Sequence, residues 1–192
     1  ILRVLGEGGM GLVYLAWQKH PIERQVALKV IKAGMDTKQV IARFEAERQA
    51  LAMLDHPNIA HVYDAGTTVT GHPYFVMEYV RGPALIALAD SEVASLPWIC
   101  ATGVQICRGM AYAHQHGVIH GDLTLKNVII SEGDESQAKI LDFGLARLVH
   151  GEADTTDENL MGTPFYIAPE QIRHEPVDER TDLYAFGVGL YR

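Results

Sequence analysis

One lysine, two aspartates and an asparagine follow one another in an order that suits chemistry on phosphate groups. Lys29 closes a short apolar run, Asp122 precedes Asn127 by five residues, and Asp142 is followed by Phe and Gly. A lysine can hold phosphate oxygens, and an aspartate can accept the proton of a hydroxyl group. Aspartate and asparagine oxygens are suitable ligands for Mg²⁺. The ordered set therefore predicts phosphoryl transfer.

The opening segment carries glycines at the spacing of a phosphate-binding turn. Residues 6–11 read Gly-Glu-Gly-Gly-Met-Gly, and glycines let a backbone approach phosphates closely. The same spacing occurs in dinucleotide-binding folds, where a helix follows it. Here residues 12–17 form a strand-like run with β-branched and aromatic side chains, which favours a strand–turn–strand hairpin. An ordinary flexible hairpin remains the alternative.

Lys29 needs a partner because it lies inside the apolar strand predicted for residues 26–31. The next segment predicts a helix with Asp36 as its N-cap, and Glu47 falls in the middle of its apolar stripe. We expect Lys29 and Glu47 to pair, so that each stabilises the charged form of the other. Two unrelated, partly exposed charges are the alternative.

A boundary between two lobes is expected near residue 80. Residues 61–66 and 73–80 predict a pair of strands, and Arg81-Gly82-Pro83 then interrupts the pattern. We therefore divide the chain into lobes of residues 1–80 and 81–192. The connecting segment, residues 77–80, has backbone groups that could bond the edge of a purine.

The second lobe is expected to be mainly helical. Residues 97–116 predict a buried helix, with an apolar side formed by Ile99, Cys100, Gly103, Val104, Cys107, Met110, Ala111 and His114. The two cysteines are expected to be core thiols in a reducing compartment, too far apart on the helix for a mutual disulfide. His114, His116 and His120 lack a partner at metal-ligand spacing, so structural roles are favoured. Short strands at 128–130 and 138–141 deliver Asp142 to a strand end.

Composition limits the partners. The chain has 16 basic and 24 acidic residues and a net charge of -8, which argues against nucleic acid or an anionic membrane as the main partner. No apolar run is long enough to span a bilayer, so no membrane contact and a cytoplasmic location are expected. The sequence begins at Ile1 and ends inside a predicted helix without a terminator. We expect a fragment of a longer chain.

The ordered motifs resemble those of a protein kinase catalytic domain. The resemblance rests on the glycine-rich segment, Val26 to Lys29, His120-Gly121-Asp122, Asp142-Phe143-Gly144 and Ala168-Pro169-Glu170. Residues 6–10 and 56–64 look most like bacterial serine/threonine kinases. The resemblance implies an α+β, bilobal fold with a small β-rich lobe carrying one helix and a mainly helical, incomplete second lobe. It also implies ATP and Mg²⁺ as cofactors and a protein substrate with Ser or Thr.

The resemblance assigns roles residue by residue. Asp122 would be the base, Lys29 would hold the phosphates with help from Glu47, and Asn127 and Asp142 would bind the metal. The nucleotide would contact Gly6, Glu7, Gly8, Gly9, Gly11, Val13, Ala27, Lys29, Met77, Glu78, Val80 and Ile129. Leu51, Val62, His120 and Phe143 would stack as a spine that rests on Asp182.

Two positions depart from the family pattern. Gly121 replaces the usual arginine, which puts activation by phosphorylation of the loop at residues 143–168 in doubt. Thr124 replaces a lysine that contacts the transferred group, and we hypothesise that Lys126 supplies the missing positive charge. Thr163 resembles the threonine that orders the base loop in serine/threonine kinases. A pseudokinase, binding nucleotide or acting as a scaffold with impaired catalysis, remains the alternative to an active enzyme.

Overall fold

The computed structural model describes residues 1–8, 11–32, 51, 53–89, 91, 94–133, 136–143 and 164–191. The chain divides into two compact units. The first consists of Ile1–Asp55 and Ala60–Tyr79, and the second of His56–Ile59 and Val80–Arg192. The helix predicted to begin near Asp36 falls almost wholly outside the described residues, and Glu47, Gly9 and Thr163 also lie outside them.

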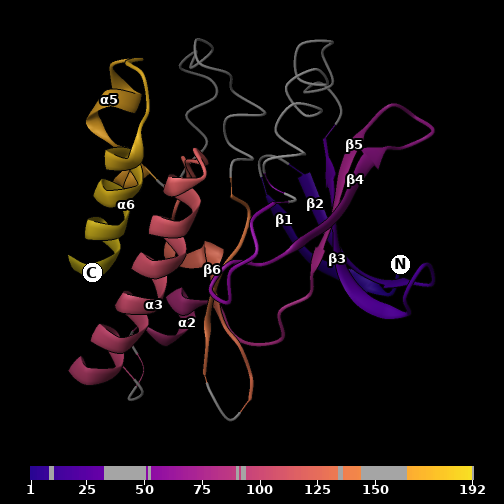
Figure 1. The fold of residues 1–192 in the computed structure, drawn as a ribbon, viewed down its shortest axis with the longest axis horizontal. Coiled ribbons are helices and arrows are strands. Elements are labelled where there is room, and N and C mark those ends of the chain that lie inside the picture. Colours follow the sequence, from indigo (N-terminus) through magenta and orange to yellow (C-terminus); the bar gives the residue numbers. More distant parts are fainter. Residues whose placement is uncertain are drawn as a thin grey trace. The chain divides into compact units, whose positions relative to one another are not determined.

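The first unit is built on a five-stranded antiparallel sheet with the strand order β1-β2-β3-β5-β4 (Figure 1). The β-branched and aromatic residues of these segments suit a pleated, half-buried surface. Pairing of β1 with β2 places Gly8 opposite Gly11, which confirms the strand–turn–strand hairpin. The strands are β1 (Arg3–Gly8), β2 (Gly11–Gln18), β3 (Arg24–Ile31), β4 (Val62–Thr67) and β5 (Pro73–Glu78).

The second unit combines helices with a two-stranded ladder. Its helices are α2 (Leu85–Leu88), α3 (Leu96–Gln115), α5 (Pro169–Ile172) and α6 (Glu179–Tyr191), and its strands are β6 (Val128–Ile130) and β7 (Ala138–Ile140). Asn58 joins α3 to β7, because its Nδ2 donates to Gln105 Oε1 at 3.1 Å and to the Ala138 carbonyl at 2.9 Å. The predicted helix at 97–116 and both short strands are confirmed. Among the described helices, none combines the length and apolarity that crossing a membrane demands.

The predicted buried side of α3 was wrong for most of its residues. The residues that α3 buries are Thr102, Ile106, Gly109, Met110 and Ala113. Of these only Met110 belonged to the predicted apolar side. Since α3 carries apolar residues on nearly all sides, the helical repeat alone does not identify the side that packs on the core.

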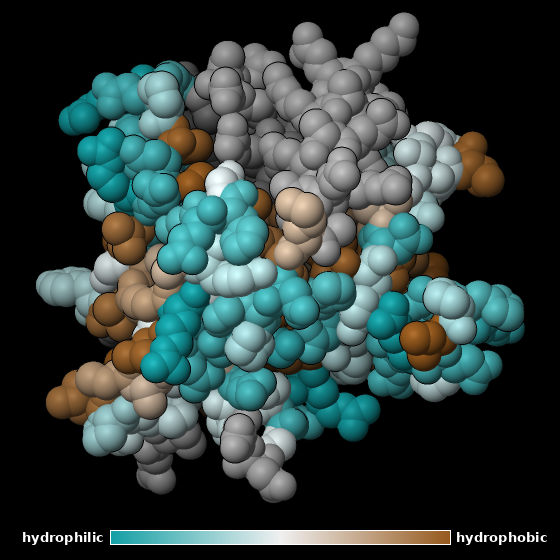
Figure 2. All heavy atoms as spheres, in the orientation of Figure 1, coloured by the Kyte–Doolittle hydropathy of each residue, from teal (hydrophilic) through white to brown (hydrophobic). Residues whose placement is uncertain are grey.

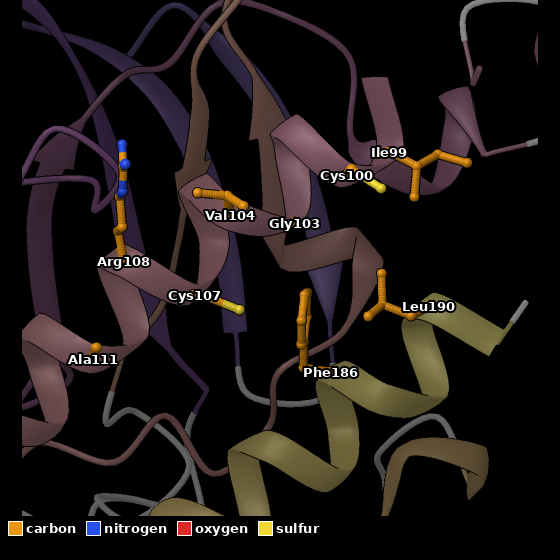
Figure 3. A pocket seen from close by; sticks show the side chains of 9 residues that line it. All are labelled: Ile99, Cys100, Gly103, Val104, Cys107, Arg108, Ala111, Phe186 and Leu190. Atoms are coloured by element: carbon orange, nitrogen blue, oxygen red, sulfur yellow. The ribbon is translucent and has the colours of Figure 1, made fainter. Parts of the chain in front are cut away.

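The other apolar side of α3 forms a groove with α6. The groove has a volume of about 520 Å³ and is lined by Ile99, Cys100, Gly103, Val104, Cys107, Arg108, Ala111, Phe186 and Leu190. In Figure 3, Phe186 and Leu190 project from α6 toward α3, and Figure 2 shows apolar side chains gathered over these two helices. Cys100 and Cys107 are exposed, so the prediction of core thiols was wrong. Burial still raises the pKa of Cys107 because it disfavours the thiolate.

Candidate active site

One face of the sheet in the first unit brings together several predicted nucleotide-binding residues. Strand register aligns Gly6 with Val13, Val13 with Lys29, and Lys29 with Phe75. Ala27, two residues before Lys29, lies opposite Met77 on β5. Since alternate residues of a strand share a face, these side chains form one surface. Lys29 is only 6% exposed, so its charge lies at a largely buried position.

Other predicted residues of the first unit lie elsewhere. Glu7 is exposed and pairs with Lys32, with 3.0 Å between Glu7 Oε1 and Lys32 Nζ. Glu78 ends β5, where its backbone N–H donates to the His61 carbonyl and its Oε2 accepts from the His61 N–H at 3.2 Å. Glu7 follows Gly6, and Glu78 follows Met77. Because adjacent residues of a strand point to opposite faces, the side chains of Glu7 and Glu78 point away from the face that carries Lys29.

The three described glycines of the opening segment are not equivalent. A Cβ at Gly11 would collide with the carbonyl oxygen of Val30, so this glycine is required by the close approach of β3. A Cβ at Gly6 or Gly8 would meet no described atom within 4 Å. Packing within the first unit therefore explains Gly11, whereas it gives no reason for glycine at the other two positions.

This difference predicts opposite results for two alanine substitutions. Gly11→Ala should lower the free energy of unfolding by about 1 to 3 kcal/mol, because the added methyl collides with backbone. Gly8→Ala should leave the unfolding free energy within about 0.5 kcal/mol but weaken ATP binding about tenfold if the bare backbone is needed beside phosphates. Chemical unfolding and ATP titration of both variants would check this. Wild-type affinity in Gly8→Ala would remove Gly8 from the proposed site.

In the second unit, hydrogen bonds fix the backbone around Asp122. Asn127 Nδ2 donates to the Asp122 carbonyl at 2.8 Å, and the Asp122 N–H donates to His120 Nδ1 at 3.3 Å. His120 Nε2 in turn donates to the Leu141 carbonyl at 2.9 Å, which requires the proton to be on Nε2. The side chain that is predicted to act as base thus extends from a backbone held on both sides.

A short 3-10 turn, η1 (Leu125–Asn127), carries Lys126 and Asn127. Thr124 begins this turn, and its Oγ1 accepts from the Lys126 N–H at 3.3 Å. Thr124 is only 7% exposed, whereas Lys126 is exposed. The threonine therefore acts as an N-cap that orders the turn, and Lys126 extends from the turn that it orders.

Asp182, on α6, holds the backbone just before Asp122. Its Oδ2 accepts from the His120 N–H and from His114 Nε2, and its Oδ1 accepts from the Gly121 N–H, all at 2.8 Å. Burial raises the pKa of Asp182, but the His114 bond, the nearby His120 and the two backbone donors outweigh it and hold the pKa below its ordinary value. The His120 and Phe143 rings pack with centroids 4.9 Å apart. The predicted contacts of His120 with Phe143 and with Asp182 are confirmed.

The two predicted metal ligands lie at the same end of the β6–β7 ladder. Val128 pairs with Ile140, and the Leu141 N–H donates to the Asn127 carbonyl at 2.7 Å. Asn127 therefore directly precedes β6 where Asp142 follows β7. Asp142 has φ 60, an unusual conformation for a residue with a side chain, although aspartate adopts it more readily than most. Backbone strain of this kind clusters at functional sites.

The donor set at this end suits Mg²⁺. No group of three or more His, Cys, Asp or Glu side chains that could hold a metal occurs in the part of the chain that the structure describes. Asn127 uses Nδ2 on the Asp122 carbonyl, which leaves Oδ1 as the atom that could bind a metal. Magnesium usually takes one or two protein oxygens and completes its shell with water and phosphate, so an amide and a carboxylate fit its needs.

The comparisons with known proteins identify the family. The sequence-family model named protein kinase domain matches residues 1–192 of this chain.

The chain belongs to the protein kinase family. Its relatives include a probable serine/threonine-protein kinase of Clostridium perfringens, 35% identical over all of this chain, and the serine/threonine-protein kinase Pkn2 of Myxococcus xanthus, 38% identical. The PknI kinase domain of Mycobacterium tuberculosis is 30% identical in sequence, and its crystal structure matches this fold with a TM-score of 0.77. The match covers 98% of this chain and 69% of that one. The α+β, bilobal kinase fold is thereby confirmed. The chain spans 28% and 24% of the two bacterial relatives.

Gln171 contacts the loop that carries Asp122, although no sequence motif singled this residue out. It directly follows Ala168-Pro169-Glu170, and its Nε2 donates to the Gly121 carbonyl at 2.9 Å. Its Oε1 accepts from the Ala168 N–H, also at 2.9 Å. A glutamine three residues after a helix N-cap is a signal for the second bond. Nothing local signals the first bond, because its partner lies 50 residues earlier.

Proposed function

We propose that this kinase domain transfers the γ-phosphoryl group of ATP to serine and threonine hydroxyls of protein substrates, with Mg²⁺ as the metal. Membership of the family and the names of the relatives, which are serine/threonine-protein kinases, support the proposal. The observation that carries it is the fixed backbone of Asp122, which Asn127 bonds directly. A fixed aspartate next to an Mg²⁺-compatible amide is what a hydroxyl-phosphorylating enzyme needs.

The proposed chemical step uses Asp122 as a general base. Its carboxylate accepts the proton of the substrate hydroxyl while the hydroxyl oxygen bonds to the γ-phosphorus and ADP leaves. Hydrogen bonds from its N–H to His120 and from Asn127 to its carbonyl limit rotation of the residue, which reduces the entropy lost on reaching the reactive geometry. Bound Mg²⁺, held by Asn127 and Asp142, would neutralise negative charge on the phosphates.

Residues of the first unit are proposed to bind the nucleotide. Lys29 would hold phosphate oxygens, and its almost complete burial strengthens its interaction with an anion. Val13, Ala27 and Met77 share its face of the sheet and would supply apolar contacts to adenine. In the second unit Ile129, on β6, and Val80 would add to them. Glu47 and Thr163 keep their proposed roles as the partner of Lys29 and as an orienting residue of the base loop.

Lys126 is proposed to contact the phosphoryl group in transfer. It is exposed on a turn that Thr124 caps. It lies four residues after the proposed base, Asp122, and directly before the proposed metal ligand, Asn127. We expect Lys126→Ala to lower kcat about a hundredfold, since removing one donor from a developing negative charge costs this much. Lys126→Arg keeps the charge and is the matched control. Steady-state kinetics at saturating ATP would measure both, and wild-type turnover in Lys126→Ala would refute the role.

The test of the proposed function is phosphoryl transfer by the complete protein. With labelled ATP and Mg²⁺ we expect label on serine and threonine of a protein or peptide substrate, identified by phosphoamino acid analysis. Thermal stabilisation by ATP, measured in parallel, reports nucleotide binding alone. Stabilisation without transfer would contradict the proposal and indicate a nucleotide-binding module.

A further inference from the structure

The peptide group between Gly121 and Asp122 is held at both of its polar atoms by side chains from outside that peptide. The carbonyl oxygen of Gly121 accepts from Gln171 Nε2 at 2.9 Å, and the N–H of Asp122 donates to His120 Nδ1 at 3.3 Å. One residue earlier, the Gly121 N–H donates to Asp182 at 2.8 Å. The backbone on the N-terminal side of Asp122 is therefore fixed by three side chains, of which Gln171 comes from α5.

This backbone is unusually free to rotate without such bonds. Gly121 has φ 77, a conformation that glycine adopts readily and that most other residues avoid. Glycine also has no side chain to resist a flip of the peptide that follows it. The chain carries this glycine directly before the proposed base, where its family usually carries an arginine.

Gln171 is itself held in the orientation that this contact requires. Its Oε1 accepts from the Ala168 N–H at 2.9 Å, and Ala168 is fully buried. A carboxamide whose oxygen accepts one backbone N–H presents its NH₂ group to the other side, where the Gly121 carbonyl lies. Glu170, the neighbour of Gln171, accepts from Thr181 Oγ1 at 2.6 Å, which ties α5 to α6. The donor therefore extends from an anchored helix.

We propose that Gln171 is a positioning residue for catalysis: it holds the Gly121–Asp122 peptide so that the carboxylate of Asp122 stays in its reactive orientation. The inference rests on the proposed kinase function. Gln171 touches neither nucleotide nor substrate in this role and acts through the backbone of Gly121. A reorientation of the base affects the chemical step, whereas nucleotide binding does not depend on it.

The test uses Gln171→Glu in the complete protein. Glutamate keeps the acceptor for Ala168 but places a second acceptor against the Gly121 carbonyl. We expect kcat to fall about ten- to a hundredfold, with the KM for ATP and the unfolding temperature unchanged. Protonated glutamic acid can donate as glutamine does, so the ratio of wild-type to variant kcat should fall as the pH is lowered toward about 4.3. A merely structural role would not produce this recovery.

Two further variants complete the test. Gln171→Leu removes the donor without adding repulsion and should also lower kcat, without recovery in acid. Ile172→Ala changes the next residue of α5, which is 58% exposed, and should leave kcat unchanged. Amide hydrogen exchange of residues 120–123 should be faster in both Gln171 variants and unchanged in Ile172→Ala.

The outcomes separate the two proposals. Wild-type kcat and wild-type exchange rates in both Gln171 variants would overturn the positioning role while the kinase function stands. A fall in kcat matched by equal losses of ATP affinity and thermal stability would also overturn it, because that result indicates general damage. If the wild-type protein transfers no phosphate, the proposed function fails, and the exchange rates still decide whether Gln171 holds the loop.

Discussion

We expect Asp122→Asn to lower kcat for transfer to a serine or threonine substrate by about two to four orders of magnitude, the usual contribution of a general base. Asparagine has nearly the shape of aspartate but cannot accept the hydroxyl proton. The hydrogen bonds from Asn127 and to His120 involve the backbone carbonyl and N–H of residue 122, which the substitution keeps. The unfolding temperature and the KM for ATP should therefore change little.

Asp142→Asn is the matched comparison, because it makes the same chemical change at a proposed metal ligand. Its kcat should also fall, but the affinity for ATP with Mg²⁺ should fall with it, since a neutral amide binds the cation less well than a carboxylate. Steady-state kinetics over a range of ATP and Mg²⁺ concentrations would separate the two variants. A kcat for Asp122→Asn within about threefold of wild type would exclude Asp122 as the base.

The strands of the first unit could be predicted because their signals are local. The apolar run around Lys29 and the glycines of residues 6–11 are each contained in one short segment. Pairing of Gly8 with Gly11 then sets the register at this end of β1 and β2. The specific need for glycine at residue 11 could not be predicted, because it depends on the approach of Val30 from another strand.

The orientation of α3 could not be predicted for a different reason. Its apolar residues cover more than one side of the helix, and burial of Ile106 and Ala113 is decided by which elements pack there. The side with Cys107 and Val104 is as apolar, yet it lies in the groove with α6. A periodic pattern identifies a helix well, but identifies its buried side only when the opposite side is polar.

The candidate site was predicted as a set of residue types, and the structure adds what holds them. In the sequence, Thr124 stands where the family pattern has a lysine. The structure shows that its hydroxyl caps the turn that carries Lys126. The bond from Gln171 to Gly121 joins residues 50 positions apart and follows from tertiary placement alone. Sequence motifs name the groups that could do chemistry, and contacts between distant elements determine their orientation.

Asp182 presents a large expected effect on stability. Its carboxylate is fully buried and accepts three hydrogen bonds, from the backbone of His120 and Gly121 and from His114. In Asp182→Asn one of the two oxygens becomes an NH₂ group, so at least one of these donors faces another donor. An unsatisfied buried donor costs about 1 to 3 kcal/mol, and we expect the free energy of unfolding at neutral pH to fall by about that amount.

The loss should depend on pH in a defined direction. The pKa of Asp182 is lowered in the folded protein, so its carboxylate contributes stability above its ordinary value of 3.8, and this contribution is lost as the pH falls through the folded pKa. The difference in unfolding free energy between wild type and Asp182→Asn should thus be constant near neutral pH and shrink in acid below about pH 4. Urea unfolding of the complete protein across this range would measure it.

Asp178→Asn is the matched control for Asp182→Asn. Asp178 lies just before α6 and is bonded to Arg180, with 2.6 Å between Arg180 Nη2 and Asp178 Oδ2. Its side-chain bond to Arg180 lowers its pKa, but the side chain is 42% exposed, so water can replace lost hydrogen bonds and screen the charge. The control should therefore unfold almost like wild type. The Asp178 carboxylate does not accept the three hydrogen bonds that Asp182 accepts. Equal losses of unfolding free energy in the two variants would therefore show that these three bonds do not account for the effect of Asp182→Asn.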